Sequence, residues 1–87
     1  MKALILYHPK SQEARTVEDY ARDFEQRKDM KIELLSLETR EGSSTATLYD
    51  VMQYPALLVI DGDGRIQKGW QGQAMPLMDE LAGYLLA

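Results

Sequence analysis

Two short, uninterrupted apolar runs stand out along the chain. KALILY occupies residues 2–7, and ALLVI occupies residues 56–60. Continuous apolar runs of this length, closed by polar residues or proline, are typical of strands that are buried on both faces of a sheet. Both runs are therefore predicted to be buried strands, and the first is expected to be a central strand.

The segment that begins at Ser11 and fades over residues 26–29 has a helical pattern. Apolar residues recur there at three- and four-residue steps, with charged residues on the other side, and they are Ala14, Val17, Ala21 and Phe24. This spacing predicts an amphipathic helix. Ser11 is the expected N-cap, because its hydroxyl can accept a hydrogen bond from an unpaired amide of the first turn.

The middle of the chain is predicted to form a strand, a polar loop and a short helix. Residues 32–37 mostly alternate apolar with polar side chains, which is typical of a strand. A polar loop is expected over residues 38–44 and a short helix over residues 45–52. Pro55 is expected to stop this helix, since proline cannot continue a helical hydrogen-bond ladder.

A hairpin and a last helix are predicted to complete the chain. Asp61-Gly62-Asp63-Gly64 can supply the positive-φ residues of a tight turn, so residues 56–60 and 65–71 should be antiparallel strands. Pro76 suits the first position of the final helix. The apolar stripe of that helix consists of Leu77, Met78, Leu81, Tyr84 and Leu85.

The order of these elements predicts an α/β fold, βαβ followed by αββα. A parallel strand pair with a crossover helix, then a hairpin and a closing helix, gives a mixed four-stranded sheet with helices on both faces. The chain has 87 residues, of which 45% are hydrophobic and 28% charged. These values are ordinary for a globular protein, and residues 1–87 are expected to form one domain.

Residues 44–72 resemble the second half of thioredoxins. In that family a helix ending in Tyr-x-Val/Ile is followed by a cis-proline, an apolar strand, a glycine hairpin and a strand that ends in glycine. The residues that match this pattern are Tyr49, Val51, Pro55, Leu57, Gly64 and Gly72. The strand-to-helix corner at residues 7–11 is similar to the active-site loop of glutaredoxins. The resemblance implies a thioredoxin-like fold, βαβαββα, and a cis peptide bond before Pro55.

The chain contains no cysteine, and Ser11-Gln12-Glu13-Ala14 stands where the resemblance implies Cys-x-x-Cys. Thiol-disulfide exchange requires a thiolate that attacks a sulfur atom, so this activity is excluded. A serine hydroxyl needs a base, and the base needs an orienting group. His8 lies three residues before Ser11, but no acidic residue is evidently placed to orient it. No catalytic residue is therefore assigned.

The resemblance also implies a binding groove beside Ser11, Gln12, Tyr54 and Pro55. Family members pair there with an extended peptide through main-chain hydrogen bonds, and this mode of binding needs no cysteine. The leading hypothesis is accordingly a non-redox module that binds a peptide or protein, or supports assembly, through this groove or through the last helix.

Two other hypotheses remain open. In the first, a non-thiol enzyme or small-anion-binding protein holds an anion on the amides that open the first helix, assisted by Ser11, His8 or Lys10. In the second, the chain is a regulatory or structural subunit without redox activity. Trp70 is a secondary candidate for the binding site, because the strand pattern leaves two arrangements open for it: it either is exposed or packs against the last helix.

The last helix carries an unusually wide apolar arc, with Asp79 and Glu80 as its charged residues. Because a surface helix usually buries a narrower stripe, this arc is interpreted either as core or as a contact with a second copy or another partner. A homodimer through this helix is one hypothesis.

Composition argues against several partners and cofactors. A net charge of −4 disfavours nucleic acid, which is bound through clustered Lys and Arg. No apolar run reaches the roughly 18 residues that span a membrane, and residues 2–7 are too short for a signal-peptide core, so a cytoplasmic protein is expected. One His and no Cys exclude a structural zinc site. No metal or cofactor is predicted.

Overall fold

The computed structural model describes residues 1–72 and 75–87, and this part of the chain contains four strands and three helices. In chain order they are β1 (Lys2–Tyr7), α1 (Ala14–Lys28), β2 (Ile32–Ser36), α2 (Arg40–Leu48), β3 (Ala56–Ile60), β4 (Ile66–Gln71) and α3 (Met78–Leu86).

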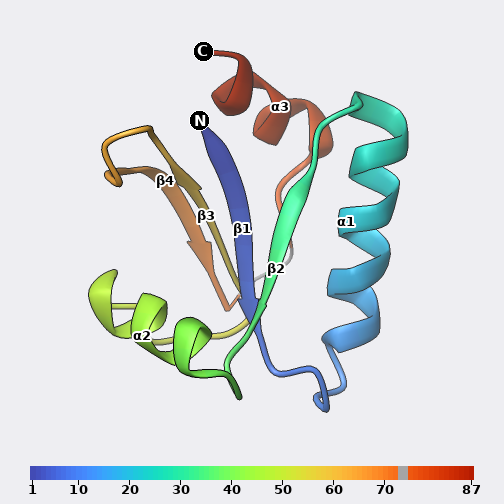
Figure 1. The fold of residues 1–87 in the computed structure, drawn as a ribbon. Coiled ribbons are helices and arrows are strands. Elements are labelled where there is room, and N and C mark those ends of the chain that lie inside the picture. The colour runs from blue at the N-terminus through green and yellow to red at the C-terminus, as the bar shows by residue number, and fades with distance from the viewer. Residues whose placement is uncertain (73–74) are drawn as a thin grey trace.

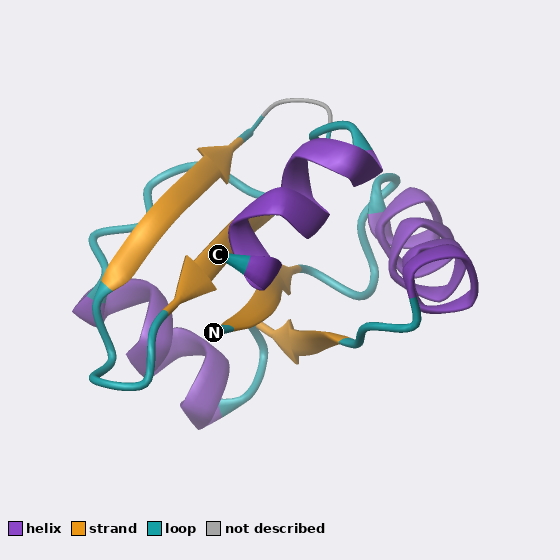
Figure 2. Ribbon diagram, turned by 90° about the horizontal axis from the view of Figure 1, so that it is seen from above, coloured by secondary structure: helices purple, strands orange, loops and turns teal. Residues whose placement is uncertain are grey.

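The strands form one mixed sheet in the order β2-β1-β3-β4. β1 and β2 are parallel, whereas β3 is antiparallel to both β1 and β4. Figures 1 and 2 show α1 and α3 covering one face of the sheet and α2 covering the other. The predicted fold class is therefore confirmed.

The two faces of the sheet carry separate apolar clusters, because successive side chains of a strand point to opposite faces. On the face under α1 and α3, Ile5 of β1 packs in one cluster with Phe24 and Leu81. On the face under α2, Leu4 and Leu6 pack with other residues, including Ala46, Val51 and Leu58. The central strands β1 and β3 thus supply both clusters, which explains their uninterrupted apolar sequences.

The boundaries of α2 differ from the prediction, because residues 40–44 belong to the helix rather than to a polar loop. The side chain of Thr39 accepts a hydrogen bond from the amide of Gly42, at 3.0 Å, and so caps a helix that begins at Arg40. The helix ends at Leu48, and Asp50 adopts a left-handed conformation with φ 54°. The predicted end at residue 52 is therefore also wrong.

The first and last helices also begin later than predicted. Ser11 is not an N-cap, since α1 begins at Ala14 after Glu13 and the Ser11 hydroxyl donates to the carbonyl of His8 at 2.7 Å. α3 begins at Met78, so Pro76 precedes the helix instead of opening it. The carbonyl of Pro76 accepts a hydrogen bond of 2.8 Å from the hydroxyl of Tyr20 on α1.

The hairpin between β3 and β4 forms as predicted, but only one of its two glycines has a positive φ. Gly64 has φ 83°, and its amide donates to the carbonyl of Asp61 at 3.0 Å. The carboxylate of Asp61 accepts hydrogen bonds from the amides of Arg65 and Asp63. These bonds to the charged form lower the pKa of Asp61.

Tyr20 is expected to make the protein less stable in strongly alkaline solution. Burial, together with the negative charge of Glu80, raises the pKa of the Tyr20 phenol from 10.0 to about 12. The unfolded chain releases this proton at the ordinary pKa, so the stabilisation is complete below about pH 10 and is lost as the pH rises through 12. Near-ultraviolet absorbance should show that Tyr20→Phe removes the last tyrosine to ionise. If the titration of the variant instead lacks a tyrosine that ionises at the ordinary pKa, this assignment is wrong.

Candidate functional site

The loop after β1 and the loop before β3 meet at one end of the sheet. Leu6 of β1 pairs with Ala56, and Ala56 pairs with Gln71 of β4, so the ends of β1 and β4 adjoin the start of β3 (Figure 1). The peptide bond between Tyr54 and Pro55 is cis. Both chain termini lie at the opposite end of the sheet in Figure 1.

The loop before β3 is held by the last residue of β4 and the glycine that follows it. The Gln71 side-chain oxygen accepts hydrogen bonds from the amides of Met52 and Gln53, at 3.0 and 3.3 Å. The amide of Gly72 donates to the carbonyl of Pro55 at 2.9 Å. Gly72 has φ 69°, and a Cβ atom there would lie 2.8 Å from the Cβ of Gln53. A glycine is therefore required where β4 passes this loop.

A pocket of about 240 Å³ lies between the first turn of α1 and this loop. We call it the α1 pocket, and its lining residues are Glu13, Thr16, Val17, Tyr54, Pro55, Gly72 and Met75. Glu13 immediately precedes α1, and it shares one face with Thr16 and Val17 because they follow it by three and four positions. Small-molecule sites usually exceed about 300 Å³, so this pocket is better matched to a single amino-acid side chain.

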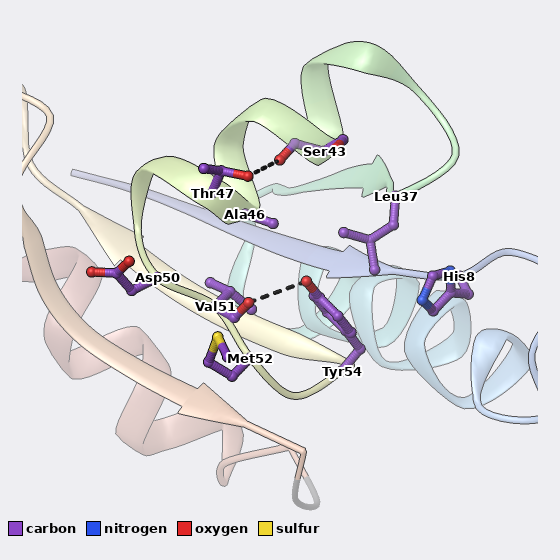
Figure 3. Close-up of a pocket in the computed structure, with 9 residues that line it drawn as sticks. All are labelled: His8, Leu37, Ser43, Ala46, Thr47, Asp50, Val51, Met52 and Tyr54. Carbon is purple, nitrogen blue, oxygen red and sulfur yellow. Dashed lines mark hydrogen bonds between the residues drawn. The ribbon is translucent and has the colours of Figure 1, made fainter.

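A second pocket, of about 360 Å³, lies on the other face of the sheet under α2. We call it the α2 pocket, and its lining residues are His8, Leu37, Ser43, Ala46, Thr47, Asp50, Val51, Met52 and Tyr54 (Figure 3). His8 and Asp50 lie at opposite ends of this pocket in Figure 3. Asp50 is therefore not placed to orient His8 as a catalytic base.

Tyr54 lines both pockets and separates them. Its hydroxyl donates to the carbonyl of Val51 at 3.1 Å, and its ring meets the His8 ring edge-on, with centroids 5.4 Å apart. These contacts hold the side chain in place. The main-chain N–H and C=O of Tyr54 form no hydrogen bond with residues 1–72 or 75–87. Within the described part of the chain, a main-chain donor and acceptor without a partner thus lie between the two pockets.

The predicted site residues are only partly brought together. Tyr54 and Pro55 line the α1 pocket, and His8 lines the α2 pocket, whereas Ser11 and Gln12 line neither. Lys10 is exposed outside both pockets.

Trp70 lies on the α3 side rather than in the groove. Its ring meets the Tyr84 ring edge-on, with centroids 5.7 Å apart, and the Lys68 ammonium lies 5.7 Å from the Trp70 ring centroid. Of the two arrangements left open by the strand pattern, the structure has the one in which Trp70 packs against the last helix.

Sequence reasoning missed the α1 side of the site. Glu13, Thr16 and Val17 line the α1 pocket, as does Met75 from the segment before α3. A sequence signal did exist for the first three, because their spacing places them on one face of the predicted helix. Met75 had no such signal, since its position depends on how α3 packs against the sheet.

The apolar arc of α3 is largely occupied by the core. Leu81 and Ala82 are buried, and Met78, Tyr84 and Leu85 pack against the cluster beneath them. Leu77 and Leu86 are 79% and 75% exposed. The homodimer through this helix therefore stays a prediction, with these two leucines as its exposed apolar residues.

Residues 1–72 and 75–87 contain no group of three or more His, Asp or Glu side chains that could hold a metal ion. None of the helices in this part of the chain has the length and apolar character that a membrane span needs.

Comparison with solved structures shows that the chain has a thioredoxin-like fold. Thioredoxin 1 from the thermophilic eubacterium Thermosipho africanus TCF52B superposes with a TM-score of 0.68 and 15% sequence identity, over 99% of this chain and 91% of that one. No protein-family model matches the chain, and a search of curated proteins returned no match. At this level of sequence identity, the comparison establishes the fold but not the function.

Proposed function

We propose that this protein is a thioredoxin-fold binding module without thiol chemistry, which takes up an extended peptide segment of a partner along Tyr54 and Pro55. The proposal is supported mainly by the main chain of Tyr54, which lies between the two pockets and forms no hydrogen bond with residues 1–72 or 75–87. An extended peptide can hydrogen-bond to such a donor and acceptor, while its side chains alternate between opposite sides. One side chain would then enter the α1 pocket and the next would face the α2 pocket.

The absence of cysteine supports a binding role over redox chemistry at this corner. Ser11 stands at the attacking position of the resembled motif, and its hydroxyl is already donated to the carbonyl of His8. Ala14 stands at the resolving position and is buried. The loop before β3 nevertheless keeps its hydrogen bonds to Gln71 and Gly72. A peptide-binding edge needs this loop and requires neither thiol.

The alternative of an anion site at the start of α1 has less support. Glu13, an acidic residue, immediately precedes the helix whose amides would bind the anion, and no Lys or Arg of the described residues lines either pocket. Like charge at this position opposes anion binding. A cytoplasmic location and the α3 homodimer remain parts of the proposal that rest on the sequence.

Nuclear magnetic resonance titration with short capped peptides tests the proposed groove. The peptides share one unstructured host sequence and differ only at the central residue, which is Lys, Glu, Leu or Tyr. At least one peptide is expected to shift the amide signals of Tyr54 and Thr16 in a saturable manner. A tag at either terminus leaves the groove clear, because both termini lie at the far end of the sheet (Figure 1).

Filling the α1 pocket provides the matched control. Thr16→Trp places a large side chain in the pocket from an exposed helix position, and it is expected to weaken binding at least about tenfold, equivalent to about 1.4 kcal/mol. Gln26→Trp adds the same side chain at another exposed position of α1 that lines neither pocket, so it should leave binding unchanged. Equal effects of the two variants, or no shifts with any peptide, would contradict the proposal.

A further inference from the structure

We infer that the groove selects peptides that carry a lysine or arginine, with the cationic side chain seated in the α1 pocket beside Glu13. This inference rests on the proposed function and specifies its ligand. Among the described residues that line the α1 pocket, Glu13 is the only charged one, and the others are neutral. The charge of the pocket is therefore negative.

The shape and composition of the α1 pocket suit a long cationic side chain better than a purely apolar one. Val17, Pro55 and Met75 provide an apolar lining for methylene groups, while Glu13 is exposed and Thr16 offers a hydroxyl. Lysine and arginine combine an apolar stem with a charged end that stays near water. Such a side chain can match both parts of the lining at once, whereas a leucine would leave the carboxylate without a partner.

The carboxylate of Glu13 is not already neutralised by another side chain. The ion pairs among residues 1–72 and 75–87 are Arg22 with Asp19 and Lys28 with Asp79, and neither involves Glu13. Lys10 and Arg15 are close in sequence, but neither lines the pocket nor pairs with Glu13. A cation supplied by the peptide would therefore be the direct partner of this carboxylate.

The α2 pocket adds to the same preference. Asp50 is its acidic residue, and no Lys or Arg among residues 1–72 and 75–87 lines it. A peptide that crosses Tyr54 thus passes between two carboxylates, one on each face of the sheet. An acidic peptide would meet like charge on both sides, so its exclusion is expected as well as the preference for a basic one.

Dissociation constants measured at low ionic strength test the inference, with a norleucine peptide added to the host series as an uncharged analogue of the Lys peptide. The Lys peptide is expected to bind about fivefold more tightly than the norleucine peptide, since a partly exposed ion pair contributes up to about 1 kcal/mol. The peptide with central Glu should bind more weakly than either. The preference for Lys should shrink as salt is added, because dissolved ions screen the pair.

Two charge-neutralising variants separate a local site from the attraction of the whole acidic protein. Glu13→Gln and Glu25→Gln change the net charge equally and both lie at exposed positions, but only Glu13 lines a pocket. Glu13→Gln is expected to abolish the preference for Lys over norleucine, and Glu25→Gln to retain it.

The outcomes distinguish the inference from the function on which it rests. If no peptide shifts the signals of Tyr54, the proposed groove itself is wrong. If peptides bind but Lys and norleucine bind equally, the groove stands and the inference is overturned. Equal loss of preference in Glu13→Gln and Glu25→Gln would also overturn it, since the attraction would then come from net charge alone.

Discussion

A Phe24→Ala variant is expected to lose about 3 to 5 kcal/mol of its free energy of unfolding. Phe24 is fully buried at 0% exposure, in the cluster between α1, α3 and the sheet. Removing its ring forfeits the apolar burial and leaves a cavity, because the surrounding side chains can close only partly. A small protein commonly has only about 5 to 15 kcal/mol in total, so this loss is a large fraction of the stability and the variant should unfold at a much lower urea concentration.

Urea denaturation followed by circular dichroism measures this loss. Phe24→Leu keeps most of the apolar volume and should cost less than about 1.5 kcal/mol. Leu86→Ala removes apolar atoms from a side chain that is 75% exposed, so it should change stability by less than about 0.5 kcal/mol. If the urea midpoint of Phe24→Ala lies close to that of Leu86→Ala, the cluster between α1, α3 and the sheet is not the main core.

A Gly42→Ala variant is expected to lose about 3 kcal/mol or more of its free energy of unfolding, because the added methyl group overpacks a site that has little room to relax. A Cβ atom at Gly42 would lie 2.7 Å from the carbonyl carbon of Ser36 and would clash with its oxygen. Both are backbone atoms at the end of β2, so they cannot move aside without shifting the strand. The methyl group would therefore push α2 away from the sheet.

Gly83→Ala is the matched control, because Gly83 also lies within a helix and a Cβ atom there would meet nothing within 4 Å. This variant should be stabilised by about 0.5 to 1 kcal/mol, since alanine restricts the unfolded chain and favours a helix. Thermal unfolding of both variants gives the comparison. If the melting temperatures of both variants shift in the same direction, helix propensity rather than the contact with Ser36 decides the effect at Gly42.

Gly42 also shows why the start of α2 could not be predicted from the sequence. Residues 40–44 are polar and include a glycine, which locally favours a loop. The contact of Gly42 with the end of β2 and the Thr39 cap decide the helix instead. Neither contact produces an apolar pattern in the sequence. The contact of Gly42 depends on the absence of a side chain, and the Thr39 cap depends on a single hydroxyl group.

The candidate site was predictable on one side of the groove and not on the other. Tyr54 and Pro55 were recognised because a characteristic run of residues surrounds them in the sequence. In the sequence, Glu13 is only a middle residue of the corner motif, although it contributes the charge of the α1 pocket. Ser11 occupies the more prominent position of that motif, but its hydroxyl donates a hydrogen bond within its own turn. Which corner side chain faces the groove depends on where α1 begins.

Local patterns along the chain are enough to predict the order of the elements and the four-stranded mixed sheet, and composition alone excludes thiol chemistry. Apolar periodicity reports which residues are buried, and the absence of cysteine removes the only side chain that can exchange disulfides. Tertiary structure decided the helix boundaries, the packing of Trp70 against Tyr84 and the pairing of Glu13 with Tyr54 and Pro55 in one pocket. These features arise from contacts between segments far apart in the chain, and local patterns do not record which distant residues will meet.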